Sequence, residues 1–97
     1  MLQVLYSQKA DADLEGIVAF TQERWGQGQA EKYLNGLVDT FYILAKRPST
    51  GRVYSTRQPA WRRFEHVSHV ILYQSIPEGI RIQRIIHKRQ LVERASR

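Results

Sequence analysis

Cationic side chains and one histidine gather near the end of the chain, in the segment RIIHKR between Arg84 and Arg89. An imidazole beside guanidinium groups can act as a general acid or base on a phosphodiester, while the arginines hold the phosphate charge. A ribonuclease would therefore use His87, Arg84 and Arg89. The alternative, which we favour from the residues alone, is that His87 only makes hydrogen bonds at a strand end and that no catalytic residue is present.

Arginine supplies most of the positive charge in the second half of the chain. Residues 1–50 hold five Lys/Arg and six Asp/Glu, a net charge of −1, whereas residues 51–97 hold ten and three, a net charge of +7. Nine of those ten cations are Arg, the residue favoured where planar, bidentate contact with carboxylate or phosphate is needed. This bias favours an anionic partner, either an acidic protein or nucleic acid, over a merely solvated surface.

The candidate target-binding residues come from this basic half: Arg62, Arg63, Arg81, Arg84, His87 and Arg89. Arg62 and Arg63 are adjacent on a predicted strand, so their side chains face opposite ways and only one joins a given face. Further members of an anion-binding surface would be Arg52 and Arg57. The interleaved Trp61 and Phe64 would permit base stacking, although core packing is the commoner role of such aromatic residues.

No motif in the sequence indicates a metal or cofactor. His66 and His69 flank Ser68 and have the donors for a metal ion, but no Cys or carboxylate joins them at ligand spacing. We therefore predict no metal site and no cofactor. The sequence contains no Walker loop, no GxGxxG and no Ser/His/Asp arrangement.

The first half of the chain predicts one strand and two helices. An apolar run at residues 2–6 predicts the strand, and Ser7 is a suitable N-cap for the first helix. Apolar residues then recur at helical spacing as far as Trp25, before Gly26-Gln27-Gly28 ends that helix. A second helix is predicted from about Gln29 to Pro48, and the short loop makes the pair an antiparallel hairpin. Leu14, Ile17, Leu37 and Phe41 should lock this hairpin onto a sheet, and the aromatic side chains of Trp25, Tyr33, Phe41 and Tyr42 are predicted to be core.

The second half predicts strands. Segments 52–56, 61–67, 69–76 and 80–89 show the expected apolar patterns, with Pro59 as a breaker and Pro77-Glu78-Gly79 as a hairpin turn. Val70–Tyr73 is a continuous apolar run, which indicates a strand buried on both faces. The predicted fold is α+β: an N-terminal strand, an antiparallel helical hairpin, then a mainly antiparallel sheet of three to four strands.

The totals indicate one domain covering residues 1–97. The chain has 97 residues, 42% of them hydrophobic, which is enough for a single core. It has no cysteine, which excludes a disulfide scaffold. No run approaches the length of a membrane span, and the N-terminus lacks a secretion signal, so a cytoplasmic location without membrane contact is expected.

The chain resembles the ParE branch of the RelE/ParE toxin superfamily from bacterial toxin–antitoxin (plasmid-stabilisation) modules. The resemblance spans nearly the whole chain, and its order and spacing are more specific than any single piece. The matching pieces are Tyr6-Ser7, Ala12-Asp13-Leu14 with Ile17, Trp25-Gly26, Gln29-Ala30 with Tyr33, Leu37 with Phe41, Leu44-Ala45, Pro48, Gly51-Arg52, Arg62-Arg63, His69-Val70-Ile71 with Tyr73, and Arg84-Ile85-Ile86-His87 with Arg89.

The resemblance implies a cytoplasmic toxin neutralised by a cognate acidic, ParD-like antitoxin, as a toxin dimer or a toxin–antitoxin hetero-oligomer. ParE-like members are associated with poisoning DNA gyrase, whereas RelE-like members cut mRNA on the ribosome. Active RelE-like members commonly use a Tyr near the C-terminus, and this chain has none after Tyr73. Many relatives carry an acidic residue where Leu91 stands. We therefore expect a gyrase inhibitor that is not an enzyme, with nucleic-acid binding through the basic half and a RelE-like endoribonuclease as the alternatives.

Overall fold

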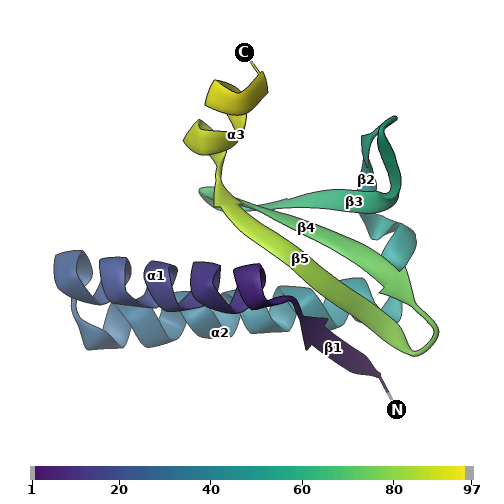
Figure 1. The fold of residues 1–97 in the computed structure, drawn as a ribbon. Coiled ribbons are helices and arrows are strands. Elements are labelled where there is room, and N and C mark those ends of the chain that lie inside the picture. Colours follow the sequence, from purple (N-terminus) through teal and green to yellow (C-terminus); the bar gives the residue numbers. More distant parts are fainter. Residues whose placement is uncertain (1, 96–97) are drawn as a thin grey trace.

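A computed structural model describes the backbone of residues 2–95 and the side chains of residues 2–91 (Figure 1). The elements follow in the order β1 (Gln3–Tyr6), α1 (Gln8–Trp25), α2 (Gln27–Lys46), a 3-10 turn (Pro48–Thr50), β2 (Arg52–Ser55), β3 (Gln58–His66), β4 (His69–Ile76), β5 (Gly79–His87) and α3 (Lys88–Ala95). None of the described helices is long and apolar enough to cross a membrane.

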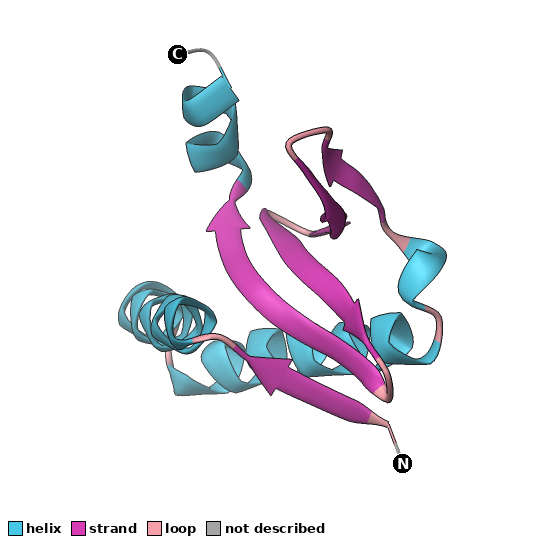
Figure 2. Ribbon diagram, turned by 45° about the vertical axis from the view of Figure 1, so that its right-hand side comes forward, coloured by secondary structure: helices cyan, strands magenta, loops and turns pink. Residues whose placement is uncertain are grey.

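The strands form one five-stranded sheet in the order β1-β5-β4-β3-β2. β1 pairs with β5 in parallel, and the other neighbours are antiparallel. The helices α1 and α2 cover one face, which we call the helix face, and the opposite face, which we call the open face, has only α3 at one end (Figure 2). This confirms the predicted α+β fold, with β1 as an additional member of the sheet.

Local sequence signals explain where the helical hairpin begins and turns. The Ser7 hydroxyl accepts a hydrogen bond from the backbone N–H of Ala10 at 3.0 Å, which confirms Ser7 as the N-cap of α1. Gly26 has φ of 92°, a left-handed conformation that glycine adopts without steric cost. The turn is therefore tighter than predicted, and α2 already begins at Gln27.

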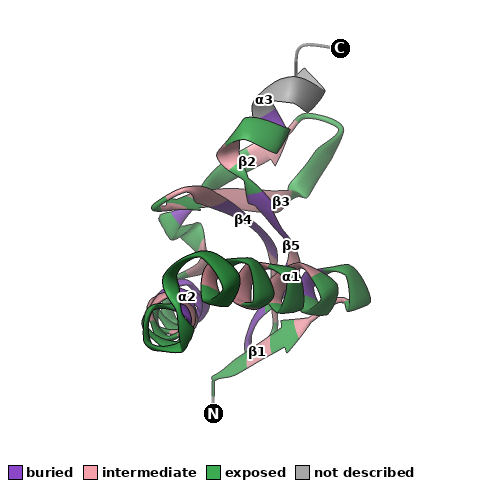
Figure 3. Ribbon diagram, turned by 90° about the vertical axis from the view of Figure 1, so that its left-hand side faces the viewer, coloured by how far each residue is buried: buried purple, intermediate pink, exposed green. Residues whose placement is uncertain are grey.

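The main core lies between the hairpin and the helix face of the sheet (Figure 3). Leu37, Phe41 and Leu44 of α2 are fully buried against Ile71 and Tyr73 of β4. Leu14 and Ile17 of α1 pack at the margin of the same cluster. Residues 70–73 of β4 are at most 2% exposed, which confirms the prediction of a strand buried on both faces.

Two aromatic side chains predicted to be core are instead exposed. Trp25 is 68% exposed and Tyr42 is 47% exposed, whereas Phe41 is buried as predicted and Tyr33 is half-buried. The reason for Trp25 is that the turn-proximal half of the hairpin extends beyond the strands (Figure 1), so the last turns of α1 have no sheet to pack against. Tyr42 follows the inward-facing Phe41 on α2, about 100° further around the helix, so it lies outside the buried stripe.

Several strand boundaries differ from the prediction, among them the start of β3 and both ends of β5. β3 starts at Gln58 and includes Pro59. The pairing between β3 and its neighbour β2 is irregular between Val53 and Ser55, so the N–H that Pro59 lacks interrupts no regular ladder of hydrogen bonds. β5 starts at Gly79, where a side-chain Cβ would come within 1.9 Å of the carbonyl oxygen of Gln3 in β1. β5 ends at His87, so Arg89 lies in the unpredicted helix α3.

Replacing Leu37 by Ala should lower the free energy of unfolding by roughly 2–5 kcal/mol, because it empties part of the core under the sheet. Urea denaturation measures this difference. The matched control is Ile43→Ala on the same helix, where the side chain is 57% exposed and the expected change is within about 0.5 kcal/mol. Equal losses for the two variants would show that Leu37 does not carry the packing of α2.

Candidate functional site

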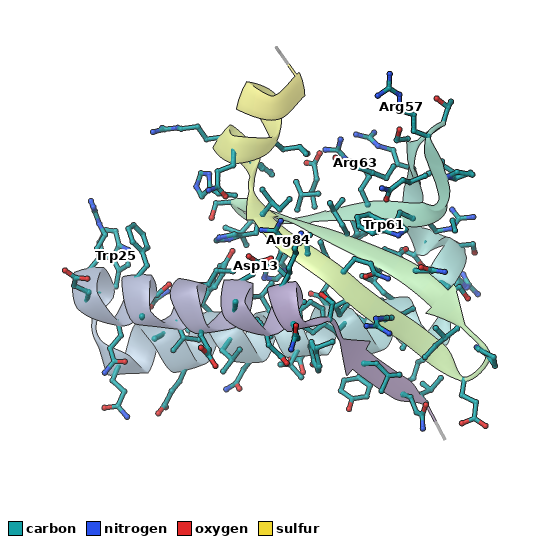
Figure 4. The ribbon with its side chains drawn as sticks, viewed as in Figure 1. Asp13, Trp25, Arg57, Trp61, Arg63 and Arg84 are labelled. Atoms are coloured by element: carbon teal, nitrogen blue, oxygen red, sulfur yellow. The ribbon has the colours of Figure 1, made fainter. Side chains whose placement is uncertain are left out.

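Arg84 is held by Asp13 of α1, between the helix and β5 (Figure 4). Arg84 Nε donates to Asp13 Oδ2 at 2.8 Å and Nη2 donates to Oδ1 at 3.0 Å. The two side chains are 25% and 16% exposed, and these hydrogen bonds raise the pKa of Arg84 above its ordinary value. The guanidinium therefore already has a carboxylate partner, and an incoming phosphate would have to compete with it.

The same carboxylate caps an open strand edge. Because β1 stops at Tyr6, the outer edge of β5 has no strand partner beyond Ile82. Ser7 bonds the carbonyl oxygens of Ile82 and Gln83, through its N–H at 3.0 Å and its hydroxyl at 2.8 Å. Asp13 Oδ2 then accepts the N–H of Ile85 at 2.9 Å. The N-terminal turns of α1 thus replace the missing strand, and they fix the position of Arg84.

His87 lies opposite His69, with ring centroids 5.4 Å apart. Tyr33 of α2 places its hydroxyl 2.7 Å from Nδ1 of His69. Burial, with a further contribution from the charge of His87, lowers the pKa of His69 to about 4, so this imidazole is neutral near pH 7. The structure therefore brings His69 to His87 and Tyr33 to His69, a grouping that was absent from the sequence-based site.

His87 is exposed and makes local hydrogen bonds at the junction of β5 and α3. The ring Nδ1 of His87 accepts the backbone N–H of Arg89 at 3.1 Å. The backbone N–H of His87 donates to the side-chain oxygen of Gln90 at 3.4 Å. These contacts satisfy backbone groups where the helix begins. Within the described residues, no group of three His, Cys, Asp or Glu side chains is placed to hold a metal ion.

A groove of about 960 Å³ opens between the protruding half of the hairpin and the ends of β4 and β5. One wall is aromatic: Phe20 is 58% exposed and Trp25 is 68% exposed. The other wall carries His69, His87 and Arg89. We call this cavity the hairpin groove. It combines an uncovered apolar surface with one guanidinium, that of Arg89, which suits a segment that is both amphipathic and acidic.

A cluster of charges occupies the open face of the sheet. Glu65 lies 3.3 Å from Arg63, 3.4 Å from Lys88 and 3.9 Å from Arg52. Three cations surrounding a single carboxylate leave a positive excess on this face. We call these four residues the Glu65 cluster.

The sequence-predicted target-binding residues are divided between the two faces of the sheet. Arg62 lies opposite the core residue Tyr73 and donates to the carbonyl oxygen of Gly51 at 2.7 Å. Arg63 and the exposed Arg81 belong to the open face, opposite Leu72 and Gln74.

The two aromatic residues proposed to stack on bases are divided in the same way. Phe64 packs against the main core, whereas Trp61 lies on the open face with Tyr54. The predicted residues therefore do not form one surface. Tyr54, Glu65 and Lys88 are members of the open face that were absent from the sequence-based list.

The chain matches known proteins over most of its length. Residues 4–92 match the family of the ParE toxin of the type II toxin–antitoxin system parDE. Toxin ParE1 of Mycobacterium tuberculosis is 37% identical over 91 residues, covering 93% of each chain. Toxin ParE1 of Caulobacter vibrioides is 32% identical and covers 84% of each chain.

Solved structures with a similar fold include toxin–antitoxin systems. A chromosomal ParDE system from P. aeruginosa gives a TM-score of 0.72 at 22% identity, covering 90% of this chain and 96% of the other. A YoeB–YefM complex from Staphylococcus aureus gives a TM-score of 0.64 at 11% identity, covering 90% and 97%. On the family match and the identity to the ParE1 toxins, the chain belongs to the ParE toxin family of type II toxin–antitoxin systems.

Proposed function

We propose that this toxin inhibits DNA gyrase through protein contacts, in the cytoplasm, and that a ParD-like antitoxin neutralises it. The observation that supports gyrase inhibition over ribonuclease activity is the ion pair between Arg84 and Asp13. A ribonuclease built on His87, Arg84 and Arg89 needs its cations directed at one phosphate. Here Arg84 is bound at the outer edge of β5, while His87 and Arg89 border the hairpin groove.

One observation favours the alternative, a RelE-like ribosome-dependent endoribonuclease. Cleavage through the 2′-hydroxyl requires both a base and an acid, and the contact between His69 and His87 supplies two imidazoles. His69 is, however, already hydrogen-bonded to Tyr33, and the lowered pKa keeps it unprotonated near neutral pH. It therefore cannot deliver the proton of a general acid near neutral pH, and a pKa of about 4 also makes it a weak base. The protein-binding proposal is the better supported of the two.

Expressing the toxin without its antitoxin should induce a DNA-damage response and stall replication, while mRNA stays intact. His87→Ala should retain more toxicity than Arg89→Ala, because docking depends on surface charge more than on proton transfer. Mapping of mRNA ends and a reporter of DNA damage, both followed after induction, measure these outcomes. Codon-phased cuts that disappear in His87→Ala would contradict the gyrase proposal and establish the ribonuclease.

The hairpin groove is the surface that we assign to the antitoxin. Phe20 and Trp25 lie uncovered on one of its walls, and Arg89 lies on the other. An acidic, amphipathic segment that folds as it binds would bury the aromatic side chains and pair with Arg89. The net charge of +7 in residues 51–97 adds a long-range attraction that acts before contact.

Trp25→Ala should weaken antitoxin binding by about tenfold or more, since exposed aromatic anchors dominate such interfaces. The matched control, Ile43→Ala, removes a comparably exposed side chain from the opposite end of the hairpin and should leave the affinity unchanged. Isothermal titration at rising salt should show an affinity that falls only partly, because salt screens the charges while apolar burial persists. An unchanged affinity in Trp25→Ala would exclude the groove as the docking site, and an affinity independent of salt would exclude the electrostatic contribution.

A further inference from the structure

The open face of the sheet carries a second surface, apart from the hairpin groove that we assign to the antitoxin. We propose that this face binds single-stranded nucleic acid, with bases stacking on Trp61 and Tyr54 and phosphates held by the Glu65 cluster. The proposal does not rest on gyrase inhibition, because it is tested with the purified toxin and nucleic acid alone.

The aromatic part of the site comes from two neighbouring strands. Tyr54 of β2 and Trp61 of β3 lie with ring centroids 6.3 Å apart and planes inclined by 32°, so the two rings are neighbours in a tilted arrangement. Both side chains are half-buried over Leu72, so their orientation is fixed by packing. A fixed, partly exposed aromatic surface accepts any base through its π-face, without reading its sequence.

A hollow of about 500 Å³ lies against these rings, which is within the size range of small-ligand sites. Besides Tyr54, Trp61 and Leu72, its lining includes Gln58, Gln83, Lys9 and Arg84, and the amide of Gln83 already donates to Gln74 at 3.2 Å. Amides can donate to and accept from the polar edge of a base, and Lys9 can meet its phosphate. One nucleotide therefore finds a stacking surface, hydrogen-bonding groups and a cation in one place.

The Glu65 cluster continues this site along the same face. Side chains two apart on a strand share a face, so Trp61, Arg63 and Glu65 lie in one row on β3. Figure 4 shows Arg63 and Arg57 on the side of the sheet away from the helical hairpin. Arg52 and Lys88 keep 72% and 44% of their side chains exposed, so they remain accessible to a phosphate chain passing the aromatic rings.

Glu65 occupies the place that a phosphate would take among these cations. It is 49% exposed and lies within 4 Å of all three. This carboxylate holds the cations in position when no ligand is bound, and it lowers their attraction for an anion. Removing its charge should therefore strengthen binding, whereas removing a residue that merely supports the fold would not.

The occupant is single-stranded, because stacking on Trp61 and Tyr54 requires bases that are not already stacked within a duplex. Neither ring nor cation reads the sugar, so oligo-dT and oligo-U should bind alike. The test is fluorescence anisotropy with labelled strands of about ten nucleotides, using the purified full-length toxin. Three phosphate contacts predict a slope near −2 for the logarithm of affinity against the logarithm of salt.

Substitutions then assign the binding to this face. Trp61→Ala should weaken binding by about 5- to 100-fold, whereas Trp25→Ala, at the far end of the hairpin, should not change it. Glu65→Gln should tighten binding by roughly two- to tenfold at low salt. The charge-matched control is Glu78→Gln, an exposed residue in the turn at the other end of β4, which should have a smaller effect.

A second measurement avoids any loss of packing in Trp61→Ala. In a Trp25→Phe background Trp61 is the single tryptophan of the chain, and a stacked base should quench its emission in proportion to binding. Any one of four results would overturn the proposal: failure to bind, binding without quenching, equal affinity for duplex DNA, or a Glu65→Gln variant that binds no more tightly than Glu78→Gln. A preference above tenfold for either sugar would overturn the claim that the sugar is not read.

Discussion

Three hydrogen bonds to the carboxylate of Asp13 join helix α1 to the edge of strand β5. Two come from the guanidinium of Arg84 and one from the backbone N–H of Ile85. The pair is only partly exposed, so water weakens it less than it weakens a surface ion pair. Because β1 is short, this contact and Ser7 together satisfy the part of the β5 edge that has no strand partner. The angle at which the hairpin leaves the sheet therefore depends on this contact.

That geometry creates two separate surfaces from one small domain. The hairpin extends past the strands and leaves Phe20 and Trp25 uncovered beside the cationic exit of β5, which produces the hairpin groove. On the other face, α3 places Leu91 over Val70 and Ile86 and leaves the neighbouring Trp61 partly accessible. An antitoxin and a nucleic-acid strand could thus be bound on opposite faces. Arg84, a candidate for target binding from the sequence, also joins the hairpin to the sheet through Asp13.

The sequence predicted what depends on local periodicity. The helical stripes gave the hairpin and its buried Leu37 and Phe41, and the apolar run of β4 gave a strand covered on both faces. The prediction that Trp25 is buried was wrong. Its position continues the apolar stripe of α1, but the sheet does not extend beneath the last turns of that helix. α3 was missed because its basic, mostly polar residues followed the strand without a break that indicated a new element.

The candidate site was harder to predict, since it depends on register and on contacts distant in sequence. Counting back from the hairpin turn, with Ile76 opposite Gly79, places His69 opposite Ile86. A shift between Leu72 and Tyr73 moves the pairing by one residue, and it brings His69 to His87. Asp13 and Arg84 are 71 residues apart in the chain, and no local pattern distinguishes their pairing from the solvation of two polar side chains.

A double-mutant cycle on Asp13 and Arg84 tests most directly whether this contact holds the hairpin to the sheet. Asp13→Asn, Arg84→Gln and the double variant are compared by urea denaturation, with Arg52 and Glu65, 3.9 Å apart and exposed, as the reference pair. We predict a coupling free energy of about 1–3 kcal/mol for Asp13 and Arg84, and less than about 1 kcal/mol for the reference pair. Additive losses, with a coupling below about 0.5 kcal/mol for Asp13 and Arg84, would contradict the central role of this contact.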